Sequence, residues 1–196
     1  MKVLIACEES QTVCKAFRAK GIEAYSCDIQ DCSGGHPEWH IKGDAIAEAY
    51  SGKYDMMIAH PPCTFITNSG VRWLYNKDGS KNADRWQNLL WARRFFIDLL
   101  NAPIKHNGIE NPIPHKHASL PKYTQLIQPW QFGHGETKAT CLWLVNLPEL
   151  QPTDIVSGRE QKIWRMPPGP ERTKLRSKTY EGIALAMADQ WSKLIL

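Results

Sequence analysis

The chain has 196 residues, of which 42% are hydrophobic, and it carries a formal net charge of +4. This length and composition suit one globular unit with a real core, so we expect a single domain over residues 1–196. No apolar run could span a bilayer, and two acids interrupt the N-terminal apolar run before a signal sequence could form, which predicts a cytoplasmic protein with no membrane partner. The six cysteines are expected to be free thiols.

The first thirty residues predict a β-α-β unit. Residues 2–7 form an apolar run with strand character, residues 11–20 have helical spacing with Ser10 as the N-cap, and residues 23–28 form a second strand. Such units are nearly always parallel and right-handed. The acid that ends the second strand of these units accepts hydrogen bonds from ribose hydroxyls, which makes Asp28 a candidate ligand for a nucleoside cofactor.

The turn between this first strand and the helix is unusual because residues 6–10 contain no glycine. It therefore does not fit a loop that binds pyrophosphate. Glu8 and Glu9 would repel phosphate but suit a cationic or zwitterionic ligand. The simpler alternative is that both acids only offset the helix dipole.

The stretch from residue 28 to residue 44 is irregular and contains several turn residues. Asp44 precedes a short helical stretch, so it is either a second acid for the cofactor or the N-cap of residues 45–50. Cysteine and histidine side chains here could hold zinc, but they lack the close pairing typical of zinc sites, and we expect no metal. These side chains are Cys27, Cys32, His36 and His40.

The apolar run 56–59 is typical of a strand buried on both faces. Pro61 and Pro62 end it directly before Cys63. Open α/β sheets place ligands at the carboxyl ends of their strands, which makes Cys63 a candidate nucleophile. The segment that follows, residues 64–82, is long for a compact domain and is predicted to be a mobile functional loop.

A second short strand, residues 108–112, also stops at a proline and presents Glu110 and Asn111. The runs 125–133 and 141–145 are candidates for antiparallel strands that close the sheet. Two helices are predicted, over residues 83–100 and 180–196, with these residues on their buried faces: Trp86, Leu90, Arg93, Ile97 and Leu100 in the first, and Ile183, Met187, Trp191 and Leu194 in the second.

Residues 151–178 form a short, loop-like insert. Its window from 154 to 178 holds seven basic residues and three acidic ones. Such a surplus suits a polyanionic partner, although a basic loop is as often only a solvated surface.

Taken together, these motifs resemble those of the DNA cytosine-5 methyltransferases in order and rough spacing over nearly the whole chain. The similarity is greatest to the short phage- and prophage-borne members that lack a large target-recognition domain, some of them linked to restriction and modification. The motifs that carry it are Asp28, Asp44, Pro61-Pro62-Cys63, Glu110-Asn111-Pro112 and residues 177–184. Pro-Pro-Cys and Glu-Asn-Pro are common tripeptides by themselves, but their combination at strand ends is fairly specific.

The resemblance implies an α/β fold with a Rossmann-like, doubly wound, mostly parallel sheet that binds S-adenosylmethionine. It implies methyl transfer to carbon 5 of cytosine in DNA, in a bacterial cytoplasm if a phage encodes the protein. Cys63 would attack carbon 6 of the ring, and Glu110 would hydrogen-bond ring nitrogen N3 and the exocyclic amine. We expect the thiol to be activated by a helix N-terminus or by Arg72. The implied site residues are Cys63, Glu110, Pro62 and Asn111 for catalysis, and Cys7, Glu8, Ser10, Asp28, Asp44 and Pro61 for the cofactor.

The chain also departs from that family. The paired arginines that normally follow the glutamate are absent, and Lys138 and Thr140 are candidate substitutes. About thirty residues replace the target-recognition domain, so either specificity is low, a partner protein supplies it, or the substrate is single-stranded or smaller than duplex DNA. The alternatives are a non-catalytic cofactor- or nucleic-acid-binding relative, for example an anti-restriction protein of a phage, an enzyme for another pyrimidine, or a zinc-stabilised nucleic-acid-binding domain.

Overall fold

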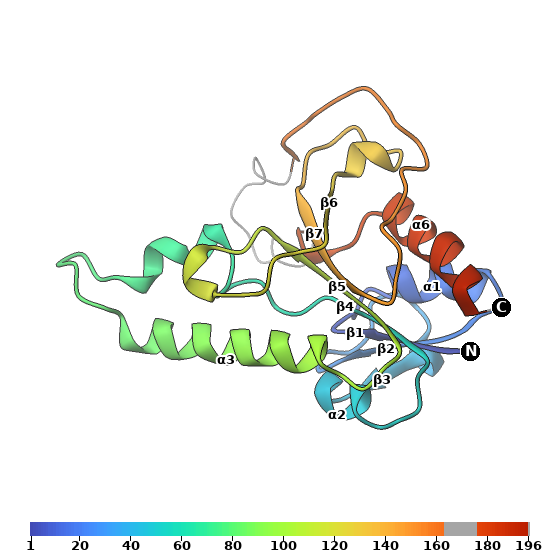
Figure 1. Ribbon diagram of the computed structural model, residues 1–196, viewed down its shortest axis with the longest axis horizontal. Coiled ribbons are helices and arrows are strands. Elements are labelled where there is room, and N and C mark those ends of the chain that lie inside the picture. The colour runs from blue at the N-terminus through green and yellow to red at the C-terminus, as the bar shows by residue number, and fades with distance from the viewer. Residues whose placement is uncertain (163–175, 196) are drawn as a thin grey trace.

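One seven-stranded sheet forms the centre of the protein, in the order β3-β2-β1-β4-β5-β7-β6 (Figure 1). The first five strands along the chain are parallel, and β7 runs antiparallel to both of its neighbours. The computed structural model describes residues 1–162 and 176–195. The strands are β1 Lys2–Ala6, β2 Glu23–Asp28, β3 His40–Lys42, β4 Met56–Ala59, β5 His106–Pro112, β6 Gln125–Ile127 and β7 Thr140–Val145.

Helices cover both faces of this sheet. In Figure 1, α1 and α6 lie above it and α2 and α3 lie below it. The α-helices are α1 Thr12–Ala19, α2 Ala45–Ala49, α3 Ala83–Leu100 and α6 Glu181–Trp191. Short 3-10 helices are η1 Pro37–Trp39, η2 Asn68–Leu74, η3 Lys116–Ala118, η4 Pro129–Gln131 and η5 Ser192–Ile195.

The alternation of side chains along β1 explains the two layers. Val3 and Ile5 pack into the core beneath α1 and α6, whereas Leu4 and Ala6 pack into the core beneath α2 and α3. Successive side chains of a strand point to opposite faces, so a strand that is apolar throughout must be covered on both sides. The predicted Rossmann-like, doubly wound, mostly parallel α/β fold is confirmed.

Three local predictions need correction. Ser10 is not the N-cap of α1, because Gln11 takes that position with a φ of 57°. Of the two predicted antiparallel strands, only β7 runs antiparallel to β5. Because β6 pairs antiparallel with β7, β6 runs in the same direction as β5. The terminal helix ends at Trp191, and Leu194 on η5 is 43% exposed.

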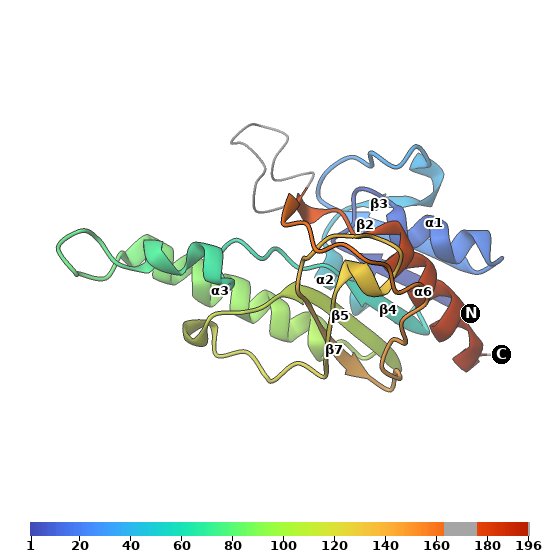
Figure 2. The ribbon, with the colours of Figure 1, turned by 90° about the horizontal axis from the view of Figure 1, so that it is seen from above.

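The buried face of α3 also differs from the predicted one. Leu89, Ala92, Phe96 and Leu99 are the buried residues, and Leu90 is 55% exposed. The first turns of α3 extend beyond the sheet (Figure 2) and contact η2 instead, where Trp86 Nε1 donates to Leu74 O at 3.0 Å. The predicted face was set by a helical spacing that starts at Trp86, and Trp86 faces η2 instead of the sheet. The predicted face is therefore wrong.

The basic insert can be followed only in part. Residues 163–175, which include Arg165, Arg172 and Lys174, lie outside the described residues. Residues 151–162 are mostly exposed, and isolated bridges join Asp154 to Phe132 and Glu160 to Glu136. No helix in the described part of the chain is both long and apolar enough to cross a membrane.

Gly182 tests how closely α6 packs on the loop that precedes β7. A Cβ at this position would meet Phe132 O, whereas a Cβ at Gly43 would have nothing within 4 Å. We expect Gly182→Ala to lower the free energy of unfolding by about 1–3 kcal/mol and Gly43→Ala to change it by less than about 0.5 kcal/mol. Urea denaturation of both variants checks this, and equal stabilities would show that the close packing is not needed.

Candidate active site

The register of the sheet brings four strand ends into one row. Ala6 is paired with both Cys27 and Ala59, and Ala59 is paired with Ile109. The residues that follow these positions therefore emerge side by side at the carboxyl edge, where open α/β sheets bind ligands. They are Cys7, Asp28, His60 and Glu110.

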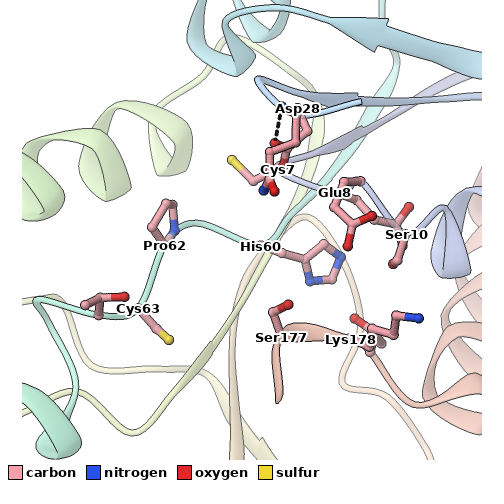
Figure 3. A pocket seen from close by; sticks show the side chains of 13 residues that line it. Cys7, Glu8, Ser10, Asp28, His60, Pro62, Cys63, Ser177 and Lys178 are labelled. Carbon is pink, nitrogen blue, oxygen red and sulfur yellow. Dashed lines mark hydrogen bonds between the residues drawn. The ribbon is translucent and has the colours of Figure 1, made fainter. Parts of the chain in front are cut away.

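A cavity of about 470 Å³ opens above this row (Figure 3). This volume is in the range of about 300–1,000 Å³ that is usual for small-molecule sites. Six of the residues predicted for the site line it, namely Cys7, Glu8, Ser10, Asp28, Pro62 and Cys63. Thr64, from the predicted functional loop, and Lys178, from the motif at residues 177–184, line it as well. So does His60, for which no role was predicted.

A buried polar contact of the site joins the ends of β4 and β5. His60 Nδ1 lies 2.8 Å from Glu110 Oε2, and the two side chains are only 10% and 9% exposed. Burial alone would lower the pKa of His60, but the hydrogen bond and charge of Glu110 outweigh it and raise that pKa. Burial would likewise raise the pKa of Glu110, yet the contact with His60 holds it below its usual value. The two residues therefore form a buried ion pair.

A second contact between β5 and the segment after β4 fixes the two prolines. Asn111 Nδ2 donates to Pro61 O at 2.7 Å. Pro61 itself does not line the cavity, and neither do Glu110 and Asn111. Asn111 thus holds the chain that delivers Cys63 to the cavity.

The sulfur of Cys63 points toward the cavity (Figure 3). Burial and the negative charge of Glu110 raise the pKa of this thiol, while Lys138 and Arg176 oppose the shift. Arg72 is not among the groups that lower this pKa, so it does not activate the thiol in this conformation. Activation by a helix N-terminus stays a prediction. The neighbouring cations come from Lys138, one of the predicted substitutes for the family's arginines, and from Arg176.

On the opposite side of the cavity, the turn between β1 and α1 is built without glycine. Cys7 takes a left-handed conformation with a φ of 59°, which non-glycine residues adopt only rarely. Glu8 is buried, and its two carboxylate oxygens accept from the N–H groups of Val13 and Cys14 at 2.7 and 3.2 Å. Glu8 therefore binds the free N–H groups at the start of α1, which agrees in part with the alternative that it only offsets the helix dipole.

The residues present fit a cationic nucleoside such as S-adenosylmethionine. Asp28 ends β2 at the cavity and is only partly buried, so its carboxylate can accept hydrogen bonds from hydroxyl groups. The negative lining groups Glu8, Glu9 and Asp28 outnumber the positive ones, Lys178 and the His60 imidazolium, which favours a positive ligand. Asp44 does not line the cavity, and its side chain caps α2 by accepting from Ile46 N at 2.8 Å.

The segment of residues 64–82, predicted to be a mobile functional loop, lies along α3. Only Thr64 of residues 64–82 lines the cavity. Arg85 Nη2 donates to Thr64 O at 2.9 Å, and Asn82 N donates to Leu74 O at 3.0 Å. In this conformation the segment leaves the cavity open.

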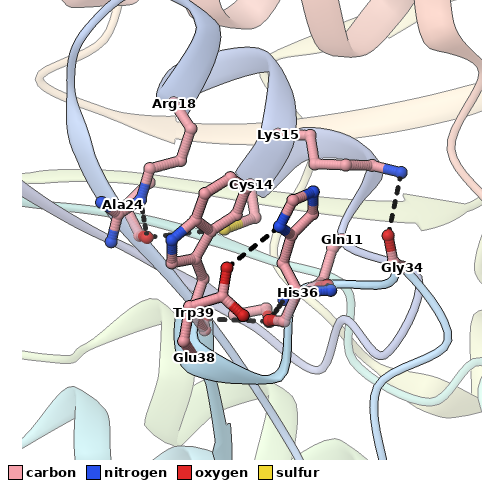
Figure 4. Close-up of polar contacts among 10 residues, drawn as sticks. Gln11, Cys14, Lys15, Arg18, Ala24, Gly34, His36, Glu38 and Trp39 are labelled. Atoms are coloured by element: carbon pink, nitrogen blue, oxygen red, sulfur yellow. Dashed lines mark hydrogen bonds and ion pairs between the residues drawn. The ribbon is translucent and has the colours of Figure 1, made fainter.

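His36, His40 and Cys27, three of the four side chains considered for zinc, are engaged in other contacts, and the Cys27 thiol lies 3.8 Å from Gly43 O. His40 uses both ring nitrogens, with Ser26 Oγ and Gln30 O each at 2.9 Å. His36 stacks on Trp39 at 3.8 Å and pairs with Glu38, and Gln11 binds the main chain of His36 (Figure 4). Among the described residues, no group of three or more potential ligands is arranged to hold a metal.

Comparisons with known proteins give distant similarities only. No protein-family model matches the chain, and no curated protein matches it. A prophage-encoded protein of E. coli, described as a DNA modification methyltransferase, aligns with a TM-score of 0.49 at 12% identity over 86% of this chain and 55% of that one. The S. pombe Dnmt2 methyltransferase aligns with a TM-score of 0.45 at 13% identity, over 76% of this chain and 51% of that one. The Entamoeba histolytica methyltransferase EhMeth aligns with a TM-score of 0.47 at 17% identity, over 82% of this chain and 57% of that one. The chain spans little more than half the length of these structures, and at this identity none of them assigns it an activity.

Sequence reasoning overlooked His60, although it directly precedes Pro61. The signal was a polar residue at the end of a strand buried on both faces. A buried polar side chain requires a partner, and the register of β4 and β5 supplies Glu110.

We expect the His60–Glu110 pair to stabilise the fold in a pH-dependent way. The raised pKa of His60 contributes stability that is complete below the unfolded value of about 6.5 and is lost as pH rises through the folded value. The lowered pKa of Glu110 contributes stability that is complete above about 4.3 and is lost as pH falls through the folded value. The coupling between the two should therefore be greatest from about pH 4.3 to 6.5.

A double-mutant cycle with His60→Gln and Glu110→Gln measures this coupling. Each single variant should lose about 3–5 kcal/mol, because it leaves the partner buried and uncompensated. The exposed pair of Arg94 and Asp98 is a matched control and should show a coupling below about 1 kcal/mol. A coupling near zero, or one that does not change between pH 5 and pH 9, would contradict the ion pair.

Proposed function

We propose that the protein transfers a methyl group from S-adenosylmethionine to carbon 5 of cytosine in DNA, through a covalent bond to Cys63. The observation that supports this most directly is the placement of Cys63 beside the buried His60–Glu110 pair, on a cavity that also contains Asp28. A thiol and a carboxyl group close together can activate a pyrimidine ring, while the acid at the end of β2 suits a nucleoside cofactor.

In the proposed reaction, the sulfur of Cys63 forms a bond to carbon 6 of the ring. The electrons displaced from the double bond make carbon 5 nucleophilic, and ring nitrogen N3 takes up a proton at the side of Glu110. S-adenosylmethionine, when bound, supplies an electrophilic methyl group for carbon 5. A base then takes the proton from carbon 5, the C6–S bond breaks and releases the Cys63 thiolate, and N3 returns its proton to Glu110, which restores the aromatic ring.

The proposed roles of the other residues follow from their contacts. Asn111 and Pro62 hold Cys63 in place, since Asn111 binds the main chain at Pro61. Asp28 would bind the ribose hydroxyls, and Cys7, Glu8 and Ser10 would form the wall beside the rest of the cofactor. Lys138 lies close enough to influence both Cys63 and Glu110, and it would help hold the ring.

We further propose that the chain acts as one domain in which residues 151–178 take the place of a target-recognition domain. The basic surplus of this insert supports binding to the DNA backbone, and sequence specificity would then come from a partner protein or be low. A base inside a duplex would have to flip out to reach Cys63.

A non-catalytic, binding role is the second candidate. It is favoured by one observation, namely that burial and Glu110 raise the pKa of Cys63 and keep the resting thiol protonated. Trapping of the covalent intermediate separates the two candidates.

The trapping experiment uses DNA that contains 5-fluorocytosine. Its carbon 5 carries fluorine in place of the hydrogen that must leave as a proton, so the covalent adduct persists. With S-adenosylmethionine present, we expect a covalent complex for the wild-type protein and for Cys32→Ser, whose thiol does not line the cavity. Cys63→Ser should form none. The adduct is detected by denaturing electrophoresis and intact mass. If the protein binds the cofactor but forms no adduct with duplex or single-stranded DNA, the non-catalytic role is favoured.

Cofactor binding can be tested without DNA. Asp28→Asn should weaken the binding of S-adenosylmethionine in calorimetry by at least about tenfold, since hydrogen bonds to a charged group contribute about 1.5–3 kcal/mol. Asp31→Asn is the matched control, because Asp31 is exposed, pairs with Lys42 and does not line the cavity. Equal affinities for both variants would rule out the proposed ribose contact.

A further inference from the structure

His60 is a buried, ionisable residue of the cavity for which the proposed reaction has so far no use. Its Nδ1 contacts Glu110, while its Nε2 is buried and has no hydrogen-bond partner among the described residues. Figure 3 shows the imidazole between Glu8 on one side and Ser177 on another. A buried nitrogen without a partner is costly, so among the described residues Glu110, which contacts Nδ1, is the hydrogen-bond partner that holds this ring in place.

The charged groups around His60 come from four elements. Glu110 on β5 is negative, and Lys138, in the segment before β7, is positive. Burial raises the pKa of Glu8, in the turn before α1, while the charge of His60 and the N–H groups of Val13 and Cys14 favour its ionised form. Cys63, in the segment after β4, lies close enough to Glu110 to respond to its charge. The two carboxylates outweigh Lys138, which favours the imidazolium form of His60 and the ionised form of Glu110.

An ionised Glu110 raises a difficulty for the proposed reaction. A carboxylate has only acceptor atoms, so it can bind the exocyclic amine of cytosine but not ring nitrogen N3, which is also an acceptor. N3 must nevertheless gain a proton when sulfur adds to carbon 6. His60, whose Nδ1 lies 2.8 Å from Glu110 Oε2, is placed to supply this proton.

We propose that His60 is a positioning residue that stores this proton, so that the His60–Glu110 pair holds one proton and the substrate ring decides which partner carries it. This inference rests on the proposed function. With the cavity empty of substrate, the proton is on His60. When the ring binds, the proton moves along the 2.8 Å contact from Nδ1 to Glu110 Oε2, and the carboxyl group can then donate to N3.

The step balances in atoms and charge. As the S–C6 bond forms, an electron pair shifts through the ring to N3, and N3 binds the proton that Glu110 donates. The Cys63 thiol loses one proton in the same step. That proton replaces the one taken from the pair, so the net result is the transfer of one proton from sulfur to N3.

The relay makes a prediction for the pH dependence. Glu110 can donate to N3 only while the pair retains its proton, so adduct formation should decline as pH rises through the raised pKa of His60. Without His60, Glu110 must hold the proton alone, and the pH at which the rate declines should change. A residue that only fills space would leave that pH unchanged.

The first test needs neither DNA nor cofactor. Nitrogen-15 NMR of histidine-labelled protein reports the protonation of each imidazole, with His60 assigned by its loss in His60→Gln. We expect His60 to be an imidazolium at pH 7, and we expect Glu110→Gln to lower its pKa. A neutral His60 at pH 7 in the wild-type protein would overturn the proposal, and this result does not depend on whether His60→Gln is stable enough for kinetics.

The second test measures the rate of adduct formation with 5-fluorocytosine DNA from pH 6 to pH 9. His60→Gln should slow adduct formation by about 10²-fold, the lower end of the usual effect of a proton-transfer group. The pH at which the rate of adduct formation declines should also move by at least about one unit. His106→Gln is the matched control, because His106 is also buried and bonded through Nδ1, but to Asn146 O at the other end of β5.

An unchanged pH profile in His60→Gln would overturn the relay and leave the proposed function standing. If the wild-type protein forms no adduct, the proposed function fails and the relay fails with it, even if NMR finds the imidazolium. The two failures are therefore distinguishable.

Discussion

The buried contact between His60 and Glu110 is the interaction on which the geometry of the site depends. It joins the carboxyl ends of β4 and β5 directly above their last paired residues. Each member needs the other, because a single charge in this position would be uncompensated. With the bond from Asn111 to Pro61, the pair fixes the segment that places Cys63 at the cavity.

The same balance of charge extends to the other wall of the cavity. Glu8 is buried within reach of the field of His60, and the start of α1 uses its two oxygens. A carboxylate thus occupies the place where glycine-rich folds admit phosphate. This arrangement explains physically why the β1–α1 turn needs no glycine here, and it is consistent with a positively charged ligand.

The sequence located six of the seven strands but missed β3, which lies in the stretch predicted to be irregular. It predicted the contacts between the strands poorly. Short apolar runs that end at prolines located β4 and β5, and an acid after an apolar run located the end of β2. These are local signals. The partner of His60, the raised pKa of Cys63 and the buried face of α3 depend on register and on packing against distant segments. Periodicity cannot reveal them, because it carries no information about which element covers which face.

The most direct test of the account is a crystal structure with S-adenosylhomocysteine and an oligonucleotide containing 5-fluorocytosine. We predict a bond between the Cys63 sulfur and carbon 6 of the base, Glu110 within hydrogen-bond distance of N3, and the ribose of the cofactor product at Asp28. Density for the cofactor product elsewhere, or a base held away from Cys63, would contradict the central claim that these strand ends form one active site.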